Sequence, residues 1–224
     1  GSEFDFYLLC SQSMSNLFPL LMLKYLPNMT ACHIGIAHDA RGPNNTIVQG
    51  EVSSLLAVME AAHVISRGQA DVMITGGSGT RLALTPLLYR GDEHLSHRNK
   101  SPVTASRPFD ADRDGSVNGE GAGAFILESL EHATARGASV LGRIRGSAST
   151  YHAPGQNGAR RAKGIERSIK SALRSAQLPP EEVGHVNAHG IGTRRDDVEE
   201  AVAVQACLGA VPVTAPKSLF GDLG

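Results

Sequence analysis

Apolar positions along the chain change between helix-like and strand-like spacing. After Glu51, apolar residues recur at every third or fourth position, which predicts a helix that stops at Arg67-Gly68. Short runs rich in β-branched residues at 45–48 and 71–75 predict a strand on either side of this helix. We expect the second strand to end at Gly76-Gly77. The segment therefore has the pattern of a strand, helix, strand unit.

A second alternating series follows in the remainder of the chain. Pro179-Pro180 ends its longest predicted helix, because proline cannot continue a helix. Alternation of this kind favours an α/β fold in which helices cover sheets. The predicted strands are 123–127, 140–145, 183–187 and 211–215, and the predicted helices are 129–136, 162–176 and 197–208.

Composition narrows the kind of protein. The 224 residues are 41% apolar and 19% charged, as expected for a folded core. The formal charge of -1 comes from 21 basic and 22 acidic residues, which argues against a nucleic-acid surface or a polybasic membrane anchor. The apolar run at 17–26 is interrupted by Pro19 and Lys24 and is too short to span a bilayer. We expect small-molecule or protein partners, with no nucleic acid and no membrane.

The cysteines match no disulfide or metal framework. There are three of them, Cys10, Cys32 and Cys207, widely spaced along the chain. A reducing, cytoplasmic location fits this pattern best. We expect Cys32 to be a buried thiol without a catalytic role.

Glu51 and His189 stand where the predicted elements would expose them. Glu51 follows a predicted strand and Gly50 and opens a helix, where backbone N–H groups favour an anion. A cysteine in that place would be activated as a thiolate. The alternative is that Glu51 only stabilises the first helical turn. His189 follows a strand and precedes Gly190, in a turn that can face a pocket.

Three stretches carry a family resemblance. The sequences RPFDADRDGSVNGEGAGAFILE at 107–128, VNAHGIGT at 186–193 and APKSLFG at 215–221 resemble the β-ketoacyl-acyl carrier protein synthases of the KAS II type, in the thiolase superfamily. The resemblance implies part of a thiolase-like α/β fold, layered α/β/α/β/α with mixed sheets. It implies an N-terminal half at 1–128, incomplete at its start, and a C-terminal half at 129–224, incomplete at its end.

The resemblance also implies an altered catalytic site. It aligns Glu51 with the nucleophilic cysteine of the family, through Gly42-Pro43-Asn44 and the strand at 71–77. His189 matches the histidine that holds the thioester carbonyl while carbon dioxide leaves and an enolate forms. Lys217 matches the family lysine, and Asp222 stands at the second catalytic histidine. An ionised aspartate accepts hydrogen bonds and cannot donate one to an enolate oxygen.

Two further acids, Asp197 and Glu200, match acidic positions that follow the first histidine of the family. The resemblance predicts an ion pair between Glu200 and Lys217. The alternative places both acids on a solvated face of a helix, with Asp197 near its start.

We expect neither a metal nor a cofactor. Asp110, Asp112 and Asp114 imitate the front of an EF-hand loop, but the twelfth position is Gly121 instead of the bidentate glutamate. The family resemblance explains this segment as a turn.

Three functions remain open, and the resemblance leaves undecided whether catalysis is retained. The first is a cysteine-less, non-elongating partner subunit of fatty acid or polyketide synthesis, similar to a chain-length factor. The second is a malonyl-acyl carrier protein decarboxylase or an active condensing acyltransferase. The third is a metal-binding pocket built from Glu51, His189 and Asp222. Expected partners are an acyl carrier protein or acyl thioester, and a second subunit in a homodimer or heterodimer.

Overall fold

The computed structural model describes residues 25–83, 94–152 and 161–224, together with Tyr7, Ser11, Leu20 and Leu23. The chain forms two compact units, Gly1–Val48 and Gln49–Gly224. All the site residues predicted from the sequence belong to the second unit. Cys10 and most of the apolar run at 17–26 lie outside the described residues.

In the first unit, helix α3 spans Met29–Ala37. Cys32 lies on this helix and is half-buried, so the prediction of a buried thiol is wrong. The predicted strand at 45–48 is also wrong, because these residues are irregular. No backbone hydrogen bond joins them to another segment within the described ranges, and an apolar run without an aligned partner cannot form a strand.

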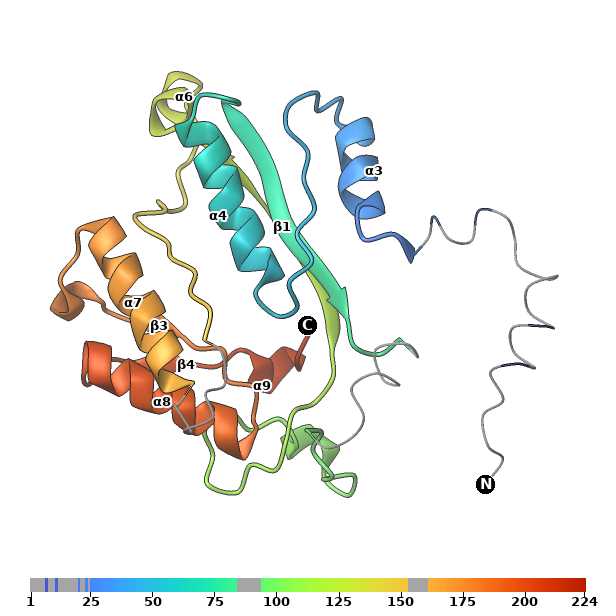
Figure 1. The fold of residues 1–224 in the computed structure, drawn as a ribbon, viewed down its shortest axis with the longest axis vertical. Helices are drawn as coiled ribbons and strands as arrows, with labels where there is room; N and C mark the ends of the chain where they lie inside the picture. The colour runs from blue at the N-terminus through green and yellow to red at the C-terminus, as the bar shows by residue number, and fades with distance from the viewer. Residues whose placement is uncertain are drawn as a thin grey trace. The chain divides into compact units, whose positions relative to one another are not determined.

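The second unit begins with a helix packed on a sheet (Figure 1). Helix α4 spans Ser53–Ser66, and its buried residues are Ala61 and Val64. Strands β1, Val72–Thr80, and β2, Glu120–Glu128, pair antiparallel along their full length. The helix ends as predicted at Arg67-Gly68, where Gly68 adopts a φ of 68°. The chain at 71–75 and 123–127 forms strands as the alternating pattern predicts, but both strands are longer than predicted.

The glycines of β1 lie inside the strand and do not end it. A Cβ atom on Gly76 would lie 2.1 Å from the carbonyl oxygen of Gly123 on β2. A Cβ atom on Gly77 would lie 2.5 Å from Cβ of Ser54 on α4. These positions therefore require glycine so that the second strand and the helix can approach closely. The prediction of a strand end at Gly76-Gly77 is wrong for this reason.

The remainder of the unit contains a parallel strand pair. Strands β3, Val186–Asn187, and β4, Val213–Thr214, pair in parallel, and the connection between them includes helix α8, Arg194–Leu208. This order confirms the predicted strand, helix, strand alternation, although both strands are short. The other elements are α6 (Leu130–Ala135), α7 (Ala162–Ala176), α9 (Lys217–Phe220) and the 3-10 turns η2 (Pro102–Thr104) and η3 (Pro180–Glu182).

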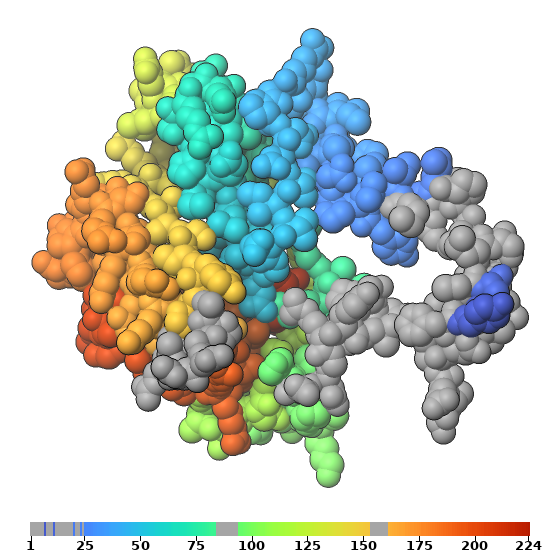
Figure 2. Space-filling model, in the orientation of Figure 1, coloured from blue at the N-terminus to red at the C-terminus, as the bar shows by residue number. Residues whose placement is uncertain are grey.

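Helix α7 has the predicted bounds, whereas the predicted strand at 140–145 does not form. Within the described residues, the segment 140–145 has no strand partner, so its apolar residues are not evidence of a sheet. Figure 2 shows atoms of α4 and α7 at the surface of the face in view. Helix α7 packs against α8.

Two charged side chains, Asp197 and Asp222, are buried near α8 and α9. The buried apolar residues of the described chain are alanines and valines, while the largest fully buried side chains are Asp197 and Asp222. Buried carboxylates are stable only when they are paired or hydrogen-bonded. Their partners therefore locate the polar centre of this unit. Among helices in the described part of the chain, none has the length and apolar character to cross a bilayer.

Candidate active site

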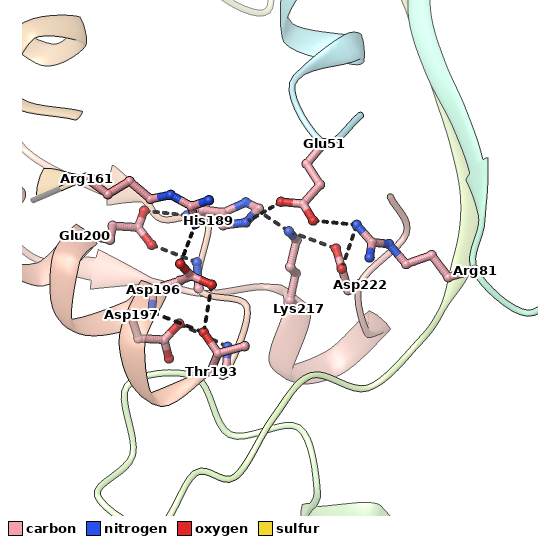
Figure 3. A network of polar contacts seen from close by, with 12 residues as sticks. Glu51, Arg81, Arg161, His189, Thr193, Asp196, Asp197, Glu200, Lys217 and Asp222 are labelled. Carbon is pink, nitrogen blue, oxygen red and sulfur yellow. Dashed lines mark hydrogen bonds and ion pairs between the residues drawn. The ribbon is translucent and has the colours of Figure 1, made fainter. Parts of the chain in front are cut away.

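The Glu51 side chain points away from its helix and into a polar network (Figure 3). Its Oε1 atom lies 2.7 Å from Nη2 of Arg81, and its Oε2 atom lies 3.0 Å from Nε2 of His189. The turn before α4 is instead held by Ser53, whose hydroxyl donates to the carbonyl oxygen of Gly50 and accepts from the amide of Gln49. Glu51 is therefore placed to act on the network beyond its own helix.

The environment of Glu51 strongly favours its ionised form. The pKa of the Glu51 carboxyl is lowered to about 2, chiefly because His189 donates a hydrogen bond to it. Burial acts in the opposite direction, and the hydrogen bond from Arg81 and the charges of His189 and Arg81 lower the pKa further. Glu51 is thus a fixed carboxylate at neutral pH.

Arg81 is a functional residue that the sequence analysis missed. It directly follows β1, and its side chain is only 5% exposed. Its Nη2 atom lies 2.7 Å from Glu51 and 2.9 Å from Oδ2 of Asp222. One nitrogen therefore bridges the two acids. One feature of the sequence could have identified it, namely a basic residue a few positions after the predicted strand at 71–75. Because the strand was predicted to end at Gly76-Gly77, Arg81 lay outside the predicted strand, helix, strand segment.

Asp222 is fixed by its backbone and by two cations. Its amide donates to the carbonyl oxygen of Val117, and its own carbonyl accepts from the amide of Gly119. Its carboxylate is 2% exposed and lies within 3.0 Å of both Lys217 and Arg81, without the direction of a strong hydrogen bond. Close charge attraction thus offsets the cost of burying this acid.

Lys217 determines the tautomer of His189. The Nζ atom of Lys217 lies 3.0 Å from Nδ1 of His189. Because an ammonium group only donates, Nδ1 must accept and carries no proton. The ring proton then lies on Nε2 and is donated to Glu51. Both ring nitrogens of His189 are therefore engaged within the network.

Glu200 supports His189 through the backbone. Its two carboxylate oxygens accept from the amides of His189 and Gly190, at 2.7 Å and 2.9 Å. The predicted ion pair between Glu200 and Lys217 is wrong, because Lys217 is turned toward Asp222 and His189. The two adjacent amides after β3 bind Glu200, and Lys217 pairs with Asp222 instead.

Asp197 ties separate segments together from a buried position. Its side chain is 1% exposed and accepts from the amides of Phe109, at 2.7 Å, and Gly192, at 3.0 Å. Arg113 lies 3.3 Å from the same carboxylate. The solvated helix face considered for Asp197 and Glu200 is therefore wrong. Asp197 connects the start of α8 to the segment around Phe109.

The network is balanced in charge. Two carboxylates, Glu51 and Asp222, face two basic side chains, Arg81 and Lys217. The described residues contain no group of three acidic, histidine or cysteine side chains that could hold a metal. The metal pocket considered for Glu51, His189 and Asp222 is wrong, because two cations already engage the carboxylates.

Comparison with known proteins identifies the family. The profile of the β-ketoacyl synthase N-terminal domain matches residues 5–133, and that of the C-terminal domain matches residues 141–223. The solved structure of a β-ketoacyl synthase from Burkholderia phymatum superimposes with a TM-score of 0.88 and 31% identity, over 96% of this chain and 53% of that chain. A type II polyketide acyl carrier protein in complex with its ketosynthase gives a TM-score of 0.80 and 30% identity, over 88% of this chain and 50% of that chain. These similarities confirm the thiolase-like α/β fold.

Curated relatives agree. The 3-oxoacyl-[acyl-carrier-protein] synthase 2 of Synechocystis sp. is 41% identical over 96% of this chain and 51% of its own length. The putative polyketide β-ketoacyl synthase 1 of Streptomyces cyaneus is 40% identical over 91% of this chain and 50% of its own length. The chain belongs to the β-ketoacyl synthase family, and it spans about half the length of these relatives.

Proposed function

We propose that the chain is part of a cysteine-less, non-elongating β-ketoacyl synthase subunit that works beside a cysteine-bearing homologue, in the manner of a chain-length factor. The observation that carries this proposal is the contact between Glu51 and His189. The family resemblance aligns Glu51 with the nucleophile. A carboxylate there cannot hold an acyl group as a thioester, because the acylated form would be a hydrolysable anhydride.

The occupied hydrogen-bond donors support the same conclusion. A decarboxylative condensation requires donors aimed at the oxygen on which negative charge develops. In this site Nε2 of His189 donates to Glu51, and Lys217 contacts Asp222 and Nδ1 of His189. Asp222 stands where the family has its second histidine and offers no donor when ionised. The groups that would stabilise an enolate are therefore engaged within the protein.

The proposed partners follow from this role. We propose that the full protein associates with a cysteine-bearing homologue, as a heterodimer in preference to a homodimer, and handles acyl chains on an acyl carrier protein. One relative is named as a 3-oxoacyl-[acyl-carrier-protein] synthase and another as a polyketide β-ketoacyl synthase, so we propose a role in either fatty acid or polyketide synthesis. The division into halves at 128/129 and the cytoplasmic location stay predictions.

Co-expression tests the proposal directly. The full-length protein should co-purify with a cysteine-bearing homologue from the same organism, and a radiolabelled acyl group should be found only on the homologue. A labelled acyl group attached to the full-length protein itself, or failure to associate with any such homologue, would contradict the proposal.

A malonyl-thioester decarboxylase is the second candidate, because His189 and Lys217 are both present and lie 3.0 Å apart. The ionised Glu51 opposes it, since its charge repels a malonyl carboxylate. Carbon dioxide release from malonyl-acyl carrier protein decides between the two. Release well above that of a His189→Ala variant would establish the decarboxylase.

A further inference from the structure

A buried arginine connects the two altered positions of the site. Arg81 comes from the end of β1, Glu51 from the turn before α4, and Asp222 from the turn after α9 (Figure 3). The three residues are far apart in sequence, and the family alignment that singled out Glu51 and Asp222 gave no role to Arg81. Arg81 nevertheless contacts both Glu51 and Asp222 through a single nitrogen, Nη2.

We propose that Arg81 is the positioning residue of this site, which fixes the Glu51 carboxylate against Nε2 of His189 and makes Glu51 and Asp222 act as one unit. Without a shared cation, two carboxylates brought to one nitrogen would repel each other, and one would take up a proton. With Arg81 in place this repulsion is offset, and Glu51 remains the acceptor for the proton on Nε2.

The division of cations between the two acids supports this assignment. Asp222 is contacted by Lys217 through Oδ1 and by Arg81 through Oδ2, so it retains a cation if either is lost. Glu51 contacts Arg81 at 2.7 Å and the imidazole of His189 at 3.0 Å, so Arg81 lies between the two acids and reaches both.

The consequence concerns which ligands the site accepts. A fixed carboxylate on Nε2 of His189 blocks the approach of a thioester carbonyl oxygen to that donor. Arg81 thereby maintains the closed state of the site, and this consequence rests on the proposed function. The positioning role itself does not depend on it, because it concerns hydrogen bonds that can be measured without any substrate.

Nuclear magnetic resonance on the full-length protein tests the role of Arg81. In the Arg81→Met variant, the titration midpoint of Glu51 should rise by about one pH unit or more toward its ordinary value, and the ¹⁵N shift of Nε2 of His189 should report a weakened hydrogen bond. The Arg81→Lys variant keeps a cation and should restore most of both signals. Unchanged Glu51 and His189 signals in a folded Arg81→Met protein would overturn the proposal.

Arg113→Met is the matched control. Arg113 is also mostly buried and also pairs with a buried aspartate, Asp197. Its loss should reduce stability without moving the Glu51 midpoint, because Glu200 holds the His189 backbone separately. A midpoint shift as large in Arg113→Met as in Arg81→Met would also overturn the proposal, since it would reflect general loosening.

A measurement on the unchanged protein covers the case in which Arg81→Met does not fold. Rotation about the Cζ–Nη2 bond of Arg81 should be slow, as expected for a guanidinium nitrogen held by two carboxylates. Rotation as fast as in free arginine in water would overturn the positioning role. Acyl labelling of the full-length protein with these signals intact would instead contradict only the proposed function.

Discussion

The carboxylate of Glu51 accepts the ring proton of His189 across 3.0 Å, and Lys217 contacts the other ring nitrogen at the same distance. This arrangement fixes one tautomer of the imidazole and leaves neither nitrogen free for a ligand. It also makes the state of the site depend on the charge of Glu51. The measurable properties of the site therefore follow from that carboxylate and its cations.

Glu51 should make the stability of the protein depend on acidic pH. Its pKa is lowered from 4.5 to about 2 in the folded state, so its contribution is complete above about pH 4.5 and is lost as pH falls toward 2. At about 1.4 kcal/mol for each unit, the contribution is at most about 3.5 kcal/mol. The difference in unfolding free energy between wild type and Glu51→Gln, followed by urea denaturation, should shrink over this range. A difference that is constant from pH 5 to pH 3 would contradict the assignment.

Asp222→Asn should destabilise the protein by about 3 kcal/mol. The substitution keeps the shape of the side chain but leaves Arg81 and Lys217 with fewer counter-charges in a buried place. Asp39→Asn is the control, because Asp39 forms an exposed pair with Arg41 and should cost less than about 1 kcal/mol. Equal losses in the two variants, measured by urea denaturation, would show that the Asp222 network contributes little.

Asp197→Ala should cost about 2–5 kcal/mol for a different reason. It leaves the buried amides of Phe109 and Gly192 without their acceptor, and each such group costs about 1–3 kcal/mol. Glu200→Ala provides a comparison, because it removes the acceptor of two other amides, at His189 and Gly190. Only the Glu200 variant should alter the His189 ring signals strongly. A thermal or urea midpoint for Asp197→Ala close to that of wild type would refute the structural role.

The helices of this unit could be predicted from the sequence because their apolar spacing is local. Helix α7 has its predicted bounds, and α4 ends at the predicted Arg67-Gly68. The strands at 45–48 and 140–145 were wrong because strand formation needs a partner at the right distance, which an apolar run does not specify. The meeting of Glu51 with His189 was predictable only through the family resemblance.

The ion pairs of the site could not be predicted from the sequence. Arg81 belongs to no recognisable motif. It reaches the site because β1 continues through Gly76 and Gly77, and glycines normally interrupt strands. The partner of Lys217 was assigned to Glu200, although two free amides after β3 compete for that carboxylate. Which partner a carboxylate takes depends on where backbone donors lie in the folded chain. The ion pairs can therefore be assigned only from the three-dimensional structure.

Glu51→Cys should create a reactive thiol. Removal of Glu51 leaves Arg81 and Lys217 with the single carboxylate of Asp222, so the site gains a net positive charge that favours a thiolate. Alkylation by iodoacetamide at pH 7, followed by peptide mass spectrometry, should be at least about tenfold faster at position 51 than at Cys207. Burial raises the pKa of the Cys207 thiol, which makes it an internal reference.

The added substitution Arg81→Met should slow the reaction at position 51, because it returns the site to zero net charge while leaving Cys207 unaffected. Equal rates with and without Arg81 would show that the arginine does not control the charge of this position. A rate at position 51 as slow as that of Cys207 would show that the cations do not reach the side chain. A slower reaction without Arg81 would instead show that this arginine, directly after β1, sets the electrostatic environment of position 51.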